Sequence, residues 1–90
     1  MAKDNEKTTG IGKVLKGLRK ARGMTQEQLA LASGLDRSYY GEIERDEKAP
    51  SLKTIFKLAK GLKVEPEDLV KAIKESGVFY NLSGDDEDDE

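Results

Sequence analysis

The fold of this chain is decided by residues 25–45, which read TQEQLALASGLDRSYYGEIER. The segment opens with a capping-box pattern, in which the Thr25 hydroxyl and the Gln28 side chain can satisfy backbone N–H groups at the start of a helix. Gly34 interrupts this helix, and Asp36 is a good N-cap for the next one, which we expect to reach the end of the segment. The pattern therefore predicts two short helices joined by a tight turn.

Three more helices are expected around this pair. An amphipathic segment with a basic outer face begins at Ile11 and ends at Gly23, which can take a left-handed C-cap conformation. Ser51 caps a fourth helix, and Pro66 suits the first position of a fifth. The sequence thus predicts an all-α, compact five-helix domain over residues 11–76. Its expected core-facing residues outside the third helix are Ile11, Val14, Leu15, Leu18, Leu29, Ala30, Ala32, Leu52, Ile55, Phe56, Ala59, Leu62, Leu69, Val70 and Ile73.

Length and composition exclude several classes of protein. Ninety residues are enough for one domain with one modest core. The chain contains no Cys and no His, which excludes disulfides, the usual nitrogen and sulfur zinc ligands, thiol nucleophiles and histidine acid–base catalysis. We therefore expect no metal, no cofactor and no small-molecule ligand. No apolar run approaches the roughly 18–20 residues of a membrane span, so we expect a cytoplasmic protein without a membrane partner.

The charge is divided unevenly along the chain. Sixteen basic and eighteen acidic residues give a net charge of −2. The last six residues, 85–90, are all acidic, and without them sixteen basic residues face twelve acidic ones, a net charge of +4 over residues 1–84. A mildly basic body is compatible with nucleic-acid binding, whereas a run of like charge is typical of a disordered tail. We expect a flexible arm at residues 1–10, a C-terminal extension at 77–84 and an acidic tail that either serves solubility alone or screens the basic face.

The third expected helix has two different sides. At about 100° per residue, one side spans about 140° and is polar, while Tyr40 and Ile43 lie opposite and can anchor the helix to a core. Arg37 on the polar side could contact guanine O6 and N7, and Glu42 could accept from cytosine N4. An ordinary solvated surface helix would look similar, but the capped helix and turn before it favour a DNA-recognition helix. The polar side consists of Arg37, Ser38, Gly41, Glu42 and Arg45.

An ordered series of motifs runs through all five expected helices. It comprises TQEQLA at 25–30, SGLDRSY at 33–39, IER at 43–45, PSL at 50–52, KLA at 57–59 and LKV at 62–64. Over residues 11 to about 73 this series closely resembles the lambda-repressor-like helix-turn-helix family, which includes phage repressors, Cro proteins, xenobiotic-response-element regulators and restriction-modification controller proteins. The resemblance implies a sequence-specific DNA-binding transcriptional regulator, a repressor, that binds a two-fold operator in double-stranded DNA as a homodimer.

The resemblance also implies roles for individual residues. Arg19 and Glu44 match a partly buried ion pair between the first and third helices. Three positions depart from the family: Tyr40 stands where Ile or Val is usual, and Asp46 and Lys63 stand where Gly is common. The implied base-contacting residues are Arg37, Ser38, Gly41 and Glu42, with Gly41 allowing close approach. The implied phosphate-contacting residues are Gln26, which also braces the recognition helix, Tyr39, Arg45, Lys48, Ser51 and Lys53.

Two questions stay open at the level of sequence. A protein-interaction module, such as an antitoxin or a coactivator with the same fold, is the alternative to a DNA-binding regulator. An enzyme is disfavoured because Glu42 and Glu44, the only candidate carboxylate pair, point about 200° apart on one helix. The dimer surface is equally open, since the candidate residues could instead complete the monomer core. These candidates are Leu69, Val70, Ile73, Val78, Phe79, Tyr80 and Leu82.

Overall fold

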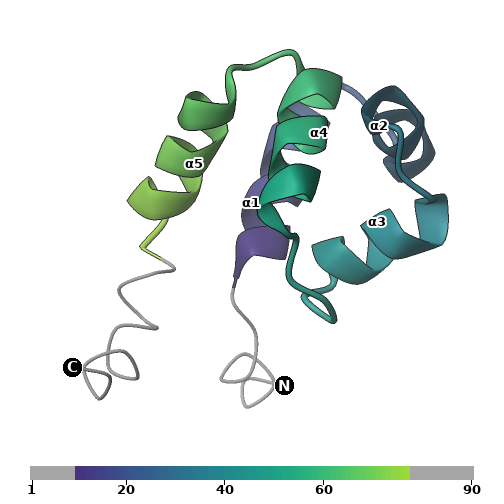
Figure 1. Ribbon diagram of the computed structural model, residues 1–90, viewed down its shortest axis with the longest axis horizontal. Helices are drawn as coiled ribbons and strands as arrows, with labels where there is room; N and C mark the ends of the chain where they lie inside the picture. Colours follow the sequence, from purple (N-terminus) through teal and green to yellow (C-terminus); the bar gives the residue numbers. More distant parts are fainter. Residues whose placement is uncertain (1–9, 78–90) are drawn as a thin grey trace.

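The computed structural model describes residues 10–77, and within them every regular element is an α-helix. The expected all-α, five-helix architecture is confirmed (Figure 1). The predicted arm, tail and most of the C-terminal extension lie outside the described residues, as do Val78, Phe79, Tyr80 and Leu82 among the dimer candidates. The helices are α1 (Ile11–Ala21), α2 (Gln26–Ser33), α3 (Arg37–Glu44), α4 (Leu52–Leu62) and α5 (Pro66–Glu75).

The helix starts are set by side chains close in sequence. Both bonds of the predicted capping box are formed: Thr25 Oγ1 accepts from the Gln28 N–H at 3.0 Å, and Gln28 Oε1 accepts from the Thr25 N–H at 2.8 Å. Asp36 accepts from two backbone N–H groups of the first turn of α3, and Ser51 does the same for α4 through one bond. Since four N–H groups at each helix start lack an intrahelical acceptor, these caps determine where α2, α3 and α4 begin.

Two helix ends carry a side chain in a conformation that favours glycine. Asp46, just beyond α3, and Lys63, the C-cap of α4, both have φ of 61°. Asp46 gains something that glycine could not supply, because its Oδ1 accepts a 3.0 Å hydrogen bond from the backbone N–H of Gly12 in α1. The departure from the family at this position therefore joins the start of α1 to the end of α3.

Close approach between helices depends on two glycines. A Cβ atom on Gly61 of α4 would overlap Ser33 Oγ of α2, and a Cβ on Gly12 would overlap the carbonyl oxygens of Ile43 and Glu44. These glycines let α2 pack against α4 and α1 pack against α3. On the other side of α4 lies α5, so α2 and α5 flank α4 on opposite sides (Figure 1).

Four residues that were expected to face the core are exposed. Ala32 is exposed, because Ser33 takes the buried place beside Leu29 in α2. Leu52 and Phe56 of α4 were expected to face the core, yet they are 69% and 55% exposed. The buried side of α4 is centred on Ile55, Leu58, Ala59 and Leu62, and Phe56 lies off that side. In α5, Leu69 and Ile73 are buried but Val70 is 43% exposed.

Candidate nucleic-acid interface

Helix α3 is held to the core by its inner side. Tyr40 and Ile43 have no exposed surface, as the amphipathic pattern predicted. Residues 34–36 join α2 to α3, with Gly34 in the left-handed conformation at φ of 72° and the Leu35 N–H bonded to the Ala30 carbonyl at 2.8 Å. The two helices also pack against each other. The arrangement is a helix-turn-helix in which α2 supports α3.

The outer side of α3 faces away from the core. Arg37 and Ser38 are exposed, and Glu42 is half-buried. Gly41, which the resemblance implied would allow close approach to DNA, is buried. Its cover consists of two guanidinium groups: a Cβ placed on Gly41 would lie 3.1 Å from Arg45 Nη1 and 3.5 Å from Arg37 Nη1. The side chains that cover Gly41 are themselves exposed.

Two of the basic side chains that are predicted to contact DNA form ion pairs with acidic side chains of the protein. Arg45 makes a two-pronged contact with Glu47, with Nε donating to Oε2 at 2.9 Å and Nη2 donating to Oε1 at 3.0 Å. This contact raises the pKa of Arg45 and lowers the pKa of Glu47. Lys48 lies 3.5 Å from the Glu42 carboxylate. These groups are one-third to more than half exposed, so each pair contributes little to the stability of the fold.

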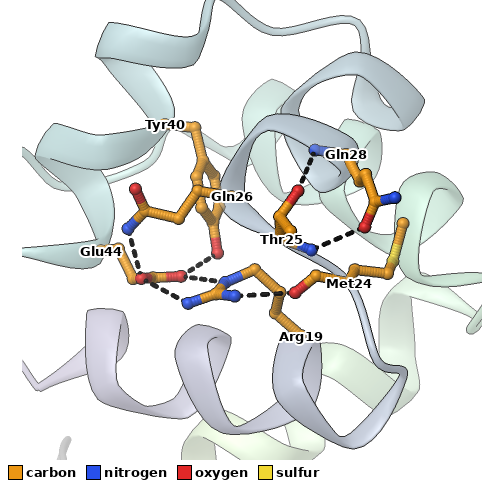
Figure 2. A network of polar contacts seen from close by, with 7 residues as sticks. All are labelled: Arg19, Met24, Thr25, Gln26, Gln28, Tyr40 and Glu44. Carbon is orange, nitrogen blue, oxygen red and sulfur yellow. Dashed lines mark hydrogen bonds and ion pairs between the residues drawn. The ribbon is translucent and has the colours of Figure 1, made fainter.

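A buried polar network supports α3 from beneath. Figure 2 shows Arg19, Gln26 and Tyr40 converging on the carboxylate of Glu44, whose side chain is only 4% exposed. Arg19 donates to both carboxylate oxygens, at 2.8 and 3.1 Å, and Gln26 Nε2 donates to Oε1 at 2.6 Å. The Tyr40 hydroxyl donates to Oε2. Arg19 also donates to the Met24 carbonyl at 2.7 Å, so the network joins α1, α2, α3 and the segment before α2.

The network favours the charged pair over its neutral form. Burial by itself would raise the pKa of Glu44, but the hydrogen bonds from Arg19, Tyr40 and Gln26 together with the Arg19 charge lower it. The hydrogen bond to Glu44 raises the pKa of Arg19. Burial, followed by the hydrogen bond to Glu44, raises the pKa of Tyr40. At neutral pH the network therefore consists of a carboxylate, a guanidinium and a neutral phenol.

Besides Arg45 and Lys48, three more of the predicted phosphate-contacting side chains have partners within the protein. The amide of Gln26 braces α3 through Glu44, as the resemblance implied. The Tyr39 hydroxyl lies 3.2 Å from Thr54 Oγ1, and Ser51 is occupied as the N-cap of α4. Lys53 is exposed on the first turn of α4. Their phosphate contacts stay predictions.

The sequence did not predict two polar contacts around α3, one made by Tyr40 and one made by Glu47. Tyr40 was expected only to anchor α3 to the core, and its hydroxyl also donates a hydrogen bond to Glu44. Its spacing of four residues from Glu44 on one helix was the available signal. Glu47 was not singled out, although it follows Arg45 by two residues in a polar loop.

Residues 10–77 contain neither a group of metal ligands nor a membrane-spanning helix. No group of three or more acidic side chains there could hold a metal ion. None of the five helices is long and apolar enough to cross a bilayer.

The arrangement of α2, the turn and α3 defines a helix-turn-helix protein. Comparison with known proteins gives the same class. A family model described as "Helix-turn-helix" matches residues 15–69, from the middle of α1 to the start of α5. The chain belongs to the helix-turn-helix family of the Cro/C1 type, as the ordered motifs predicted.

Individual relatives are regulators and controller proteins. The chain is 40% identical over 74 residues to the immunity repressor protein of Bacillus phage phi105, covering 79% of this chain and 51% of that protein. It is 41% identical over 54 residues to the transcriptional regulator SutR of Escherichia coli, covering 60% and 30%. The crystal structure of the restriction-modification controller protein C.AhdI from Aeromonas hydrophila superposes with a TM-score of 0.64 at 49% identity, covering 68% of this chain and 92% of that one. The chain thus spans about half or less of the length of the first two relatives.

Proposed function

We propose that this chain is a sequence-specific DNA-binding transcriptional regulator, a repressor, that inserts α3 into the major groove. The observation that carries the proposal is the two-sidedness of α3: Tyr40 and Ile43 fix it to the core, while Arg37 and Ser38 are exposed on the outer side. The names of the relatives, a phage repressor and a transcriptional regulator, support the same function. The chain would work in the cytoplasm, where bacterial DNA lies.

The outer side of α3 supplies the groups that read bases. Arg37 presents a guanidinium with no ion-pair partner within residues 10–77, which suits the bidentate contact to guanine. Ser38 can donate or accept, and Glu42 can accept from cytosine once it exchanges its partner Lys48. These three side chains would set the sequence preference.

The phosphate contacts would come from the segments on either side of α3. The N-terminus of α2 at Gln26 and that of α4 at Ser51 and Lys53 present backbone N–H groups, which favour an anion. Tyr39 in the first turn of α3 and Lys48 in the loop after α3 would add to these contacts. Contacts of this kind position the protein on the duplex without reading sequence.

A comparison of two variants tests this division into base-contacting and phosphate-contacting side chains. The operator is first obtained by selecting bound duplexes from a random pool with the full chain. Arg37→Ala should then reduce discrimination at one base pair by about 1–3 kcal/mol, whereas Lys53→Ala should weaken binding to all duplexes alike. Equal effects of the two variants on every duplex would contradict the assignment. Failure of the full chain to enrich any sequence would contradict the proposed function and leave a protein-interaction module as the alternative.

We propose further that the chain binds its operator as a homodimer, with half-sites about 34–36 Å apart. Among the described candidates, Leu69 and Ile73 are buried within the monomer and cannot supply the contact, whereas Val70 is 43% exposed and can contribute to it. The exposed apolar side chains of α4 are better placed: Leu52 and Phe56 lie four residues apart and share one side of the helix. A second copy of the chain would cover them.

Sedimentation equilibrium tests the dimer surface. Phe56→Ala should raise the dissociation constant of the dimer without lowering the helix content, because Phe56 lies outside the core. Leu31→Ala is the matched control, since Leu31 on α2 is 82% exposed and lies outside the proposed surface. A monomeric wild-type chain, or the same dimer constant for Phe56→Ala and wild type, would contradict this surface.

The carboxylates of Glu42 and Glu44 would not form a catalytic pair. Glu44 accepts four hydrogen bonds with its two oxygens, so it has no capacity left for proton transfer.

A further inference from the structure

Arg37, Gly41 and Arg45 form a row along the outer side of α3, since they are spaced four residues apart. The middle position has no side chain, and the guanidinium groups of Arg37 and Arg45 extend over it from both ends. Arg45 therefore does not project away from the end of α3. Its Nη1 lies 3.1 Å from the place of a Gly41 Cβ, within the proposed base-reading face.

Glu47 determines which edge of the Arg45 guanidinium stays free. The carboxylate takes the edge formed by Nε and Nη2, at 2.9 and 3.0 Å. A guanidinium has five N–H groups, so the edge formed by Nη1 and Nη2 keeps two parallel donors. Two parallel donors match guanine O6 and N7 in the major groove.

The carboxylate also offsets a repulsion. Two guanidinium groups near the same glycine repel each other, and a carboxylate beside one of them reduces the electrostatic energy of that repulsion. Without Glu47, Arg45 would be free to turn toward solvent or toward any phosphate.

We propose that Arg45 reads a guanine beside the base read by Arg37, and that Glu47 is a positioning residue that holds the Arg45 guanidinium over Gly41. This inference rests on the proposed function and replaces the predicted phosphate contact of Arg45 with a base contact. A lysine at position 45 would keep the charge but lose the planar fork, so it could serve a phosphate and not a guanine.

The test uses the full chain and the operator selected by the wild-type protein. Each base pair of the operator is changed in turn, and affinities are measured for wild type, Arg45→Lys, Glu47→Ala and the control Glu75→Ala. Glu75→Ala also removes one glutamate carboxylate, but from an exposed position on α5 that lies far along the chain from Arg45. Helix content by circular dichroism checks that each variant is folded.

We expect Arg45→Lys to lose preference at one base pair by about 5-fold or more, the lower range for a bidentate base contact. That base pair should differ from the one affected by Arg37→Ala. Glu47→Ala should lose preference at the same base pair as Arg45→Lys, while its affinity for random duplexes does not fall, because a negative charge has been removed. Glu75→Ala should keep the wild-type preference.

Two results would overturn the inference while leaving the proposed function intact. One is an Arg45→Lys variant that keeps the wild-type preference at every base pair, as a phosphate contact would. The other is a Glu47→Ala variant that binds the operator and random duplexes more tightly by the same factor, which would make Glu47 a simple competitor of DNA. A wild-type chain that selects no sequence would instead overturn the proposed function itself.

Discussion

Replacing Glu44 by alanine tests the buried polar network most directly. The change removes both acceptor oxygens, so Arg19, Gln26 and Tyr40 each lose a hydrogen-bond acceptor. Arg19 would retain only its bond to the Met24 carbonyl while its side chain stays 9% exposed. Removing one partner of a buried ion pair costs about 3–5 kcal/mol, because the other charge is left uncompensated.

This loss is large compared with the expected stability of the domain. A domain of about 70 residues has a free energy of unfolding of about 3.5–10 kcal/mol at 0.05–0.15 kcal/mol per residue. Glu44→Ala should therefore lower the urea midpoint strongly, and a wild-type free energy of unfolding near the lower limit would leave the variant partly unfolded at room temperature. Urea denaturation followed by circular dichroism measures the loss, and DNA binding should fall in proportion to the folded fraction.

Two controls separate burial from charge. Glu47→Ala removes an exposed carboxylate and should leave the urea midpoint unchanged. The double variant Arg19→Met with Glu44→Leu should be more stable than Glu44→Ala alone, because no buried charge is left unpaired. A loss below about 1 kcal/mol for Glu44→Ala would refute the reasoning, since it would mean that water solvates Arg19 in the folded state.

Further predictions concern backbone, pH and the tail. Gly17→Ala should raise stability by about 0.5–1 kcal/mol in thermal melts, because nothing lies within 4 Å of a Cβ there, whereas Gly12→Ala should lower it by overlapping backbone carbonyls of α3. The pKa of Glu44 is lowered on folding, so stability should be lost as pH falls below its ordinary value of 4.5, and Glu44→Gln should lack that loss. The pKa of Tyr40 is raised on folding, so stability should be lost as pH rises above 10.0, and Tyr40→Phe should lack that loss. Urea midpoints measured across the pH range test the acid and the alkaline prediction. Deleting residues 85–90 should tighten binding to random duplexes at low salt if the tail screens the basic face; equal affinities would leave it a role in solubility alone.

The helix positions were predictable because they depend on neighbours in sequence. Thr25, Asp36 and Ser51 cap backbone groups two or three residues away, so the pattern predicted the starts of α2, α3 and α4 correctly. The anchoring of α3 by Tyr40 and Ile43 followed equally from helical periodicity.

The errors arose where a helix meets partners distant in sequence. Phe56 fits an apolar stripe, but whether that part of the stripe is covered depends on where α2 and α5 lie along α4. The resemblance implied that Gln26 braces α3, but the acceptor of its amide, Glu44, lies eighteen residues away and only the structure identifies it. Periodicity describes one helix at a time and carries no information about these neighbours.

The sequence by itself determined the five helices, the tight turn before α3 and the chemistry of the residues on its outer side, because caps, glycines and periodicity act within a few positions along the chain. Only the tertiary structure decided that Tyr40 and Gln26 donate to Glu44 and that Leu52 and Phe56 stay exposed. It also decided that Arg45, paired with Glu47, lies over Gly41. The physical reason is that the partners of a side chain are set by how whole helices pack and by which rotamer that packing leaves open.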